Sequence, residues 1–153
     1  MSNDPVIIDD KLVWYMDGSV FKGDNHRWYS PNRQYFLVFQ DDGNLVMYKD
    51  GGDKIWASND STKYKYALNT ADKLVFQTDG NMVIYDKDGK ALWSSDTDCI
   101  SLIGIANSYS GKCLKLTNGG ELFIIAENKK DPNDVIHRRA TGPATDEGQF
   151  KKT

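Results

Sequence analysis

An internal repeat constrains the fold of this chain more than any other feature of its sequence. Residues 37–48, LVFQDDGNLVMY, align without a gap with residues 74–85, LVFQTDGNMVIY. The same offset places the segment Trp56-Ala-Ser on the segment Trp93-Ser-Ser. A third copy, residues 114–125, keeps the apolar positions and one turn glycine but has lost the polar positions. Three similar units are therefore expected to build one domain.

The repeats lie at about residues 30–60, 67–97 and 107–142, followed by a polar tail at 143–153, and a single domain covers residues 1–153. In the third copy the segment that begins at Arg139 is placed where the others have Trp-Ala-Ser or Trp-Ser-Ser. This placement requires an insertion around residues 129–133. The chain length of 153 residues and the 39% hydrophobic content suit one folded core.

Each copy is predicted to form β-strands rather than helices. Polar and apolar residues alternate, β-branched and aromatic residues are frequent, and Asp-Gly or Gly-Gly pairs recur about every ten residues. A strand is also the better prediction for the segment from Ser94 to Gly111. Strand alternation likewise explains the segment Lys63-Tyr-Lys-Tyr66 better than a nucleic-acid surface does. The fold class is all-β.

The hairpin turn inside each repeat decides which residues share a face. A three-residue loop of residues 78–80, with Gly80 in the left-handed region and a G1 bulge, pairs Gln77 with Asn81. A two-residue loop would mix polar and apolar side chains on both faces. The three-residue loop instead sorts them, and it buries the apolar face of each hairpin. The buried set is Leu37, Phe39, Leu45, Met47, Leu74, Phe76, Met82 and Ile84.

The opposite face of each hairpin carries a carboxylate, two amides and a phenol around one valine. It contains no histidine base, no second carboxylate at fixed spacing and no nucleophile, so an enzymatic function is not expected. Sugar hydroxyls both donate and accept hydrogen bonds, and this residue set can do the same. Such a shallow site would bind one sugar at about millimolar Kd, so several sites are needed. The candidate carbohydrate-binding residues are Gln40, Asp42, Asn44, Val46, Tyr48, Gln77, Asp79, Asn81, Val83 and Tyr85.

This pattern, Gln-x-Asp-x-Asn-x-Val-x-Tyr in two copies, resembles the mannose-binding motif of the monocot bulb-type lectins, the snowdrop-lectin-like family. The resemblance is close from about residue 18 to residue 97 and looser to residue 142. It implies a β-prism II fold, with three antiparallel sheets around a pseudo-threefold axis and Trp56 and Trp93 in the core. It also implies that Asp and Asn hold the mannose 2-hydroxyl, Gln the 3-hydroxyl and Tyr the 4-hydroxyl, while Val packs on the ring.

The third copy departs from the motif, with Thr117, Gly119, Glu121, Phe123 and Ile125 at the five positions. No mannose is expected there, and the C-terminal tail or a second subunit is expected to cover Phe123 and Ile125. The resemblance leaves a homodimer open. The predicted function is therefore that of a lectin that recognises mannose or mannose-containing glycans through two intact sites. The alternative is a protein-interaction, toxin-like or antimicrobial module on a lectin scaffold.

Other features give expectations about partners, cofactors and location. With 19 basic against 22 acidic residues the net charge is −3, which does not favour nucleic acid or an anionic membrane. No apolar run reaches the roughly 20 residues of a membrane span, and His26 and His137 are isolated, so neither membrane insertion nor a metal or cofactor is expected. Without a visible signal peptide, the expected location is cytoplasmic or reached without a classical signal. Cys99 and Cys113 form either one bridge or two thiols.

Overall fold

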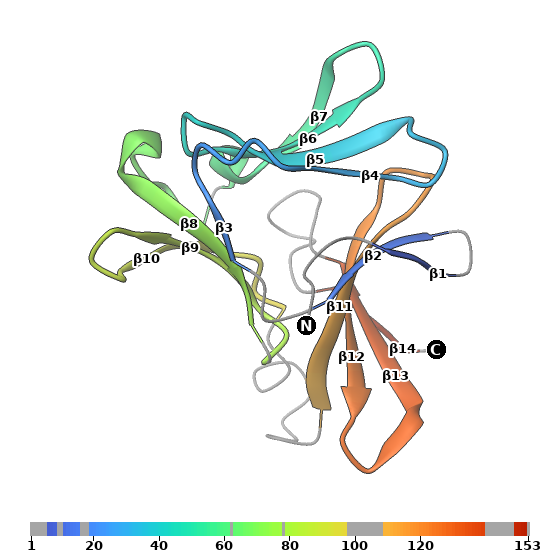
Figure 1. Ribbon diagram of the computed structural model, residues 1–153. Coiled ribbons are helices and arrows are strands. Elements are labelled where there is room, and N and C mark those ends of the chain that lie inside the picture. Colours follow the sequence, from blue (N-terminus) through green and yellow to red (C-terminus); the bar gives the residue numbers. More distant parts are fainter. Residues whose placement is uncertain are drawn as a thin grey trace.

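The computed structural model describes residues 6–8, 11–15, 19–61, 63–77, 79–97, 109–139 and 149–152. These residues form strands, turns and two single-turn 3₁₀ helices, η1 (Ser58–Asp60) and η2 (Leu68–Thr70). The described part holds no helix long and apolar enough to cross a membrane. Three antiparallel sheets surround a common centre (Figure 1). The predicted all-β class with three antiparallel sheets is therefore confirmed.

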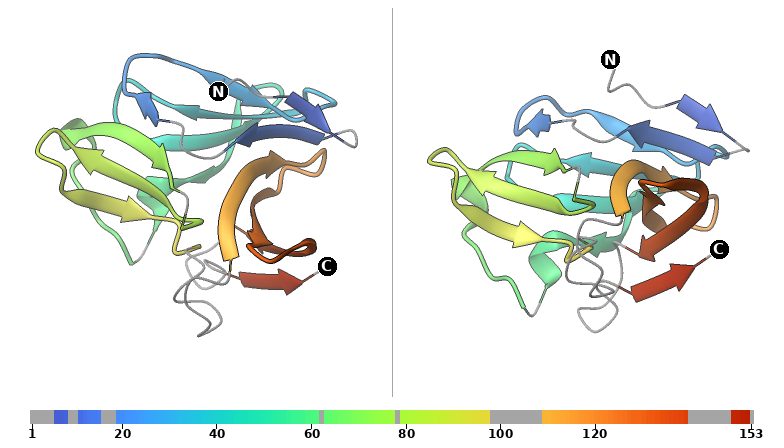
Figure 2. Two further views of the ribbon diagram at one scale, coloured as in Figure 1. Left: turned by 60° about the horizontal axis from the view of Figure 1, so that its bottom comes forward. Right: turned by 90° about the horizontal axis from the view of Figure 1, so that it is seen from below.

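Each repeat supplies three consecutive strands of one sheet (Figure 2). The N-terminal part of the chain adds one strand to the first sheet, one to the second and two to the third, and the C-terminal tail adds a last strand to the third. The first sheet has the order β4 (Arg27–Tyr29), β5 (Tyr35–Phe39), β6 (Leu45–Lys49) and β7 (Asp53–Ala57). The second has the order β10 (Ala91–Ser94), β9 (Met82–Asp86), β8 (Ala71–Phe76) and β3 (Ser19–Phe21). The third has the order β1 (Val6–Ile8), β2 (Lys11–Tyr15), β11 (Tyr109–Leu116), β12 (Leu122–Asn128), β13 (Asp131–Arg139) and β14 (Gln149–Lys152).

The hairpin turn of every repeat is the predicted three-residue loop. In the second repeat the Gln77 N–H donates to the Asn81 carbonyl at 2.9 Å, and the Gly80 N–H donates to the Gln77 carbonyl at 2.9 Å. Gly80 has φ +91°, in the left-handed region that favours glycine. The first and third repeats have the same two hydrogen bonds, and Gly43 and Gly120 have φ values of +92° and +79°. The same turn therefore places equivalent side chains on the same face of the hairpin in all three repeats.

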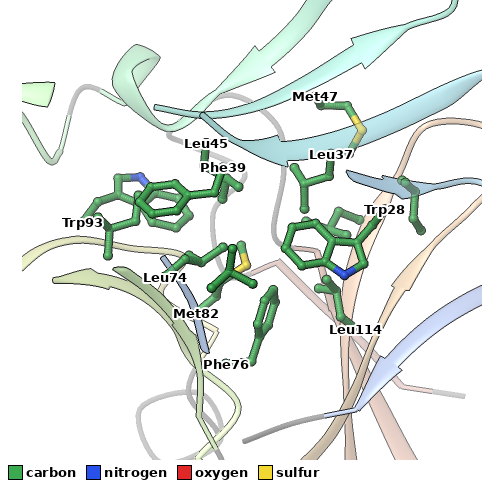
Figure 3. Packing of buried hydrophobic residues seen from close by; sticks show 14 of the residues in the cluster. Trp28, Leu37, Phe39, Leu45, Met47, Leu74, Phe76, Met82, Trp93 and Leu114 are labelled. Carbon is green, nitrogen blue, oxygen red and sulfur yellow. The ribbon is translucent and has the colours of Figure 1, made fainter. Parts of the chain in front are cut away.

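One face of each sheet packs into a single core (Figure 3). All eight apolar side chains predicted for the first two hairpins are fully buried, at 0% exposure. Leu114, Leu116, Leu122 and Ile124 join them from the third sheet. The rings of Trp56 and Trp93 lie edge to face at 5.7 Å, which confirms them as core residues. The opposite face of each sheet points away from this core.

The turn of each repeat lies against the start of another repeat. A Cβ on Gly43 would come within 1.9 Å of the Leu68 carbonyl, and a Cβ on Gly111 within 2.9 Å of Gly80. A Cβ on Gly120 would come within 2.6 Å of the Tyr35 ring. The first turn thus meets the second repeat, the second turn the third repeat, and the third turn the first. These contacts close the three units into a ring and fix the position of every turn.

The closing strand of the third repeat differs from the prediction by one residue. Trp56 is the Cα partner of Met47, and Trp93 is the partner of Ile84. The equivalent position in the third sheet, Ile124, has Arg138 as its partner rather than Arg139. All three closing strands have a register shift near this position. The difference comes from the length of the insertion: Arg138 lies 14 residues after Ile124, against nine from Met47 to Trp56, so the third repeat has five extra residues rather than six.

Two predictions lie wholly or partly outside the described residues. Cys99 is not among them, so the pairing of Cys99 with Cys113 stays open. The predicted strand from Ser94 to Gly111 is described only at its ends, where Ser94 belongs to β10 and residues 109–111 belong to β11.

Candidate functional site

Two polar clusters occupy the outer faces of the first and second sheets, opposite the core. We call the set Gln40, Asp42, Asn44, Val46 and Tyr48 site 1, and the set Gln77, Asp79, Asn81, Val83 and Tyr85 site 2. Site 1 lies on the β5–β6 hairpin and site 2 on the β8–β9 hairpin. The predicted residues are thus brought together in two separate groups, on two sheets that face different directions (Figure 1).

The glutamine and the tyrosine of each site are hydrogen-bonded to each other. The Gln40 amide donates from Nε2 to the Tyr48 hydroxyl at 2.5 Å, and Gln77 donates to Tyr85 in the same way. The phenol oxygen accepts this bond and keeps its own proton to donate. The amide keeps its carbonyl oxygen as an acceptor. Each pair therefore presents a donor and an acceptor side by side, which suits two neighbouring hydroxyls of a sugar.

The valine of each site lies between these paired side chains and is almost fully buried. Val46 is 1% exposed and Val83 is 4% exposed. Strand pairing places Val38 opposite Val46 and Val75 opposite Val83, so two valines lie together beneath each Gln–Tyr pair. At this exposure the valine offers a ligand only a small contact area. The polar groups above it form most of the accessible surface.

The aspartate and the asparagine of each site are fixed by the hairpin turn. Asp42 accepts a hydrogen bond from the Asn44 backbone N–H at 2.9 Å, and Asp79 accepts one from the Asn81 backbone N–H at 2.8 Å. The second carboxylate oxygen of each aspartate can then accept a hydrogen bond from a ligand. The side-chain carbonyl of Asn44 accepts from the Asn59 backbone N–H at 3.1 Å. The amide NH2 group of Asn44 therefore points outward as a donor.

Two buried serines, which the sequence analysis assigned no role, hold these asparagines. Ser58 accepts from the Leu45 N–H at 3.1 Å and donates to the Asn44 side-chain carbonyl at 3.1 Å. Ser95 accepts from the Met82 N–H at 3.0 Å and donates to the Asn81 side-chain carbonyl at 3.2 Å. Both serines are 0% exposed. The sequence did contain a signal for these serines, because Ser58 and Ser95 occupy the same position of the repeat, at the end of the Trp-Ala-Ser and Trp-Ser-Ser segments.

A second hydroxyl supports each turn from below. The Tyr66 hydroxyl donates to the Gly43 carbonyl at 2.9 Å and lies 2.9 Å from the Ser58 hydroxyl. In the second repeat the Thr97 hydroxyl donates to the Gly80 carbonyl at 2.7 Å and lies 2.6 Å from the Ser95 hydroxyl. A tyrosine and a threonine thus make the same two contacts. Burial, with a smaller contribution from Asp42, raises the pKa of Tyr66 to about 12.

The position of Tyr66 corrects the interpretation of the segment Lys63-Tyr-Lys-Tyr66. These residues form no strand, so strand alternation is the wrong explanation for their pattern. Instead the two tyrosines pack against the core, and Tyr64 donates to Asp96 at 2.6 Å. Lys63 forms an ion pair with the same carboxylate at 2.7 Å. The two tyrosines are therefore explained by tertiary contacts: Tyr66 binds the first repeat and Tyr64 binds the second.

The third repeat has the same turn without the same chemistry. The Thr117 hydroxyl accepts from the Glu121 backbone N–H at 3.1 Å, which takes the place of the Asp–Asn contact. Phe123 and Ile125 pack with Cys113 and Val135 in a small apolar cluster separate from the core. No Gln–Tyr pair and no Asp–Asn pair exists at these positions. That the tail or a second subunit covers this cluster stays a prediction.

No metal site accompanies the polar clusters. Within the ranges that the structure describes, no group of three or more His, Cys, Asp and Glu side chains could hold a metal ion. The donors and acceptors of sites 1 and 2 are thus uncharged except for one aspartate each, and their geometry suits a neutral, hydroxyl-rich ligand.

Comparison with known proteins places this fold among lectins. No protein-family model and no curated protein matches the sequence. A lectin from Allium sativum is 27% identical, with a TM-score of 0.54 over 73% of this chain and 90% of the other. A mannose-specific lectin from Crocus vernus is 19% identical, with a TM-score of 0.55 over 78% of this chain and 91% of the other.

The mannose-specific agglutinin from snowdrop, solved with methyl α-D-mannoside, is 24% identical, with a TM-score of 0.51 over 73% of this chain and 86% of the other. These neighbours share the arrangement of three antiparallel sheets. The chain therefore has the β-prism II fold of the monocot bulb-type mannose-binding lectins, the family that its two repeated motifs resemble.

Proposed function

We propose that this protein is a lectin that binds mannose or mannose-containing glycans through sites 1 and 2. The observation that carries the proposal is the duplicated geometry. Both sites combine a Gln–Tyr pair with an Asp–Asn pair, and both support the asparagine with a buried serine. Neighbours of the same fold include the Crocus lectin described as mannose specific and the snowdrop agglutinin solved with a mannoside.

The donor and acceptor pattern supports mannose as the sugar. The second carboxylate oxygen of Asp42 and the amide NH2 group of Asn44 lie at one end of site 1, where together they can accept from and donate to one hydroxyl. The Gln40–Tyr48 pair supplies two more contacts for a neighbouring pair of hydroxyls. We assign the axial 2-hydroxyl to the Asp–Asn end, so this pair would distinguish mannose from glucose. Site 2 repeats the assignment with Asp79 and Asn81.

No catalytic step is proposed. Each site has one carboxylate, which is engaged by a backbone N–H, and has no histidine or nucleophile nearby in the sequence. Hydrolysis of a glycosidic bond normally uses two carboxyl groups at a fixed separation. The function that this chemistry supports is recognition without turnover, by a single domain whose third repeat lacks a sugar site.

The test is an NMR titration of the whole chain with methyl α-mannoside, with the matching glucoside and galactoside as controls. We expect selective, saturable shifts at the backbone amides of Asn44 and Asn81, with Kd values on the order of millimolar. Asp42→Ala should remove binding at site 1, Asp79→Ala should remove binding at site 2, and the double variant should remove both.

Asp41→Ala is the matched control, because Asp41 is the exposed neighbour of Asp42 in the same turn and lies outside the motif. It should leave both sites intact. Absence of mannoside binding by the unmodified protein would overturn the proposal and favour a protein-interaction module. In that event the Asp42/Asp79 double variant would keep its protein partner.

A further inference from the structure

The two sites have the same five motif residues but differ in the residues that are paired with the tyrosine. In the first sheet the Cα partner of Tyr48 on β5 is Phe36, and the partner of Phe36 on β4 is Tyr29. In the second sheet the partner of Tyr85 on β8 is Lys73, and the partner of Lys73 on β3 is Phe21. Directly paired residues point to the same face of a sheet. Each site tyrosine therefore lies in a row of side chains that crosses the sheet, with Lys54 of β7 on the other side of Tyr48 and Ala91 of β10 on the other side of Tyr85.

In site 1 this row is a continuous run of three aromatic rings in contact. The rings of Phe36 and Tyr48 are stacked, with centroids 5.2 Å apart and an interplanar angle of 27°. The rings of Tyr29 and Phe36 follow at 5.4 Å. The Arg27 guanidinium lies 4.5 Å from the Phe36 centroid, and the Arg33 guanidinium lies 4.0 Å from the Tyr29 centroid. Contacts of this kind limit the motion of each ring in the row.

In site 2 the corresponding row has no stack. Among the described residues no ring contact and no cation–π contact involves Tyr85 or Lys73. The ring of Phe21 at the end of the row is 48% exposed. The Gln77 hydrogen bond restrains the Tyr85 hydroxyl, as Gln40 restrains that of Tyr48, but in the described part of the chain no aromatic ring is stacked on Tyr85 as Phe36 is on Tyr48. Tyr85 therefore has more freedom to lose when a ligand binds.

From this difference we infer that Phe36 is a positioning residue that makes site 1 the tighter of two unequal mannose sites. The inference rests on the proposed function. Ordering a mobile side chain on binding lowers affinity, and a side chain that is already held avoids this loss. The expected difference in Kd between the sites is about three- to tenfold, which matches the usual range for ordering one such side chain. Phe36 acts through Tyr48 and needs no contact with the sugar.

The test exchanges the two row residues and measures each site separately. The backbone amides of Asn44 and Asn81 report sites 1 and 2 in one NMR titration with methyl α-mannoside. Phe36→Lys should weaken site 1 by about three- to tenfold and leave site 2 unchanged. Lys73→Phe should extend the row from Phe21 to Tyr85 and strengthen site 2 by a similar factor. Phe36→Tyr keeps an aromatic ring and should restore the unmodified affinity.

A purely structural role for Phe36 would give different results. It would lower the unfolding midpoint without changing the ratio of the two affinities. If Phe36→Lys fails to fold, Lys73→Phe still tests the inference, because it adds a ring and removes none. Equal affinities at the two sites of the unmodified protein, or no gain in site 2 from Lys73→Phe, would overturn the inference. Neither result would affect the proposed function, which fails only if neither site binds mannoside.

Discussion

At the scale of single residues, the sites depend on buried hydroxyl groups as much as on the residues that face the ligand. Ser58 and Ser95 each join the backbone of one strand to the asparagine of a turn. The repeated motif shows the asparagines, but only the folded chain shows what orients them. Both serines lie 13 or 14 residues from the strand N–H and the asparagine that they bind.

Replacing Ser58 with alanine should therefore affect stability and one site together. The Leu45 N–H is buried and would lose its acceptor, which costs about 1–3 kcal/mol of unfolding free energy. The Asn44 amide would lose one restraint, so mannoside binding should weaken at site 1 and stay unchanged at site 2. Urea denaturation and a site-resolved titration measure the two effects. Ser95→Ala should give the reverse pattern, and equal weakening of both sites by either variant would contradict this prediction.

The Tyr66 hydroxyl should make stability depend on alkaline pH. Its pKa is raised from 10.0 to about 12, chiefly by burial, so the folded state keeps the proton more tightly than the unfolded state. The contribution of the protonated Tyr66 hydroxyl to the unfolding free energy is present in full below pH 10. It is lost as the pH rises through about 12. Two pKa units correspond to a loss of at most about 2.7 kcal/mol.

Tyr66→Phe isolates this effect because the other tyrosines and lysines titrate equally in both proteins. We expect the unfolding free energies of the two proteins, measured in urea from pH 8 to 12, to converge as the pH rises. Curves that stay parallel over the whole range would contradict the assignment. Tyr64→Phe is a useful comparison, since the pKa of Tyr64 is also raised, mainly by burial, and its hydroxyl binds Asp96 instead of the turn.

At the scale of elements, the hairpin turns both present the ligand groups and join the repeats. The three-residue loop was predictable because its glycine and the polarity of the flanking residues are local in sequence. That Gly43 also lies against η2 was not predictable, because the contact joins two repeats. The glycine is therefore required for two reasons, its positive φ and the closeness of the Leu68 carbonyl.

Gly43→Ala and Gly89→Ala should separate these two reasons. Both glycines have a positive φ, +92° and +85°, but a Cβ on Gly89 would meet nothing within 4 Å. Gly89→Ala should cost only the left-handed backbone conformation, about 1–2 kcal/mol. Gly43→Ala should exceed this by at least about 2 kcal/mol, because the Leu68 carbonyl must move. Urea unfolding midpoints compare the two variants, and equal losses would show that the turn has room to adjust.

At the scale of the whole molecule, the ring of three repeats sets the directions in which the sites face. Sites 1 and 2 lie on the outer faces of different sheets, so one sugar residue cannot fill both. If both sites bind mannose as proposed, one chain can bridge two branches of a mannan. Weak single sites then give useful binding through multivalency.

Each single-site variant should therefore lose the ability to cross-link a mannan. Asp42→Ala and Asp79→Ala keep one site each, so binding of the monosaccharide should persist with half the number of sites. Precipitation of a branched mannan, followed by light scattering, should disappear in both. Precipitation by either single variant would contradict the prediction for a single chain and would indicate that chains associate, as in the homodimer that the resemblance leaves open.

The sequence by itself determined the all-β class, the three units, the turn geometry and the residues on each face. These follow from local rules, because strand side chains alternate and a turn glycine sets the register of its own hairpin. Only the tertiary structure decided which hydroxyls support the turns, why Tyr48 and Tyr85 have different neighbours, and that Arg138 stands at the third tryptophan position. Those features depend on which N-terminal strand pairs with which sheet and on how the inserted residues of the third repeat are accommodated before β13 pairs with β12. Contacts between distant segments leave no periodic pattern in a sequence, so packing alone reveals them.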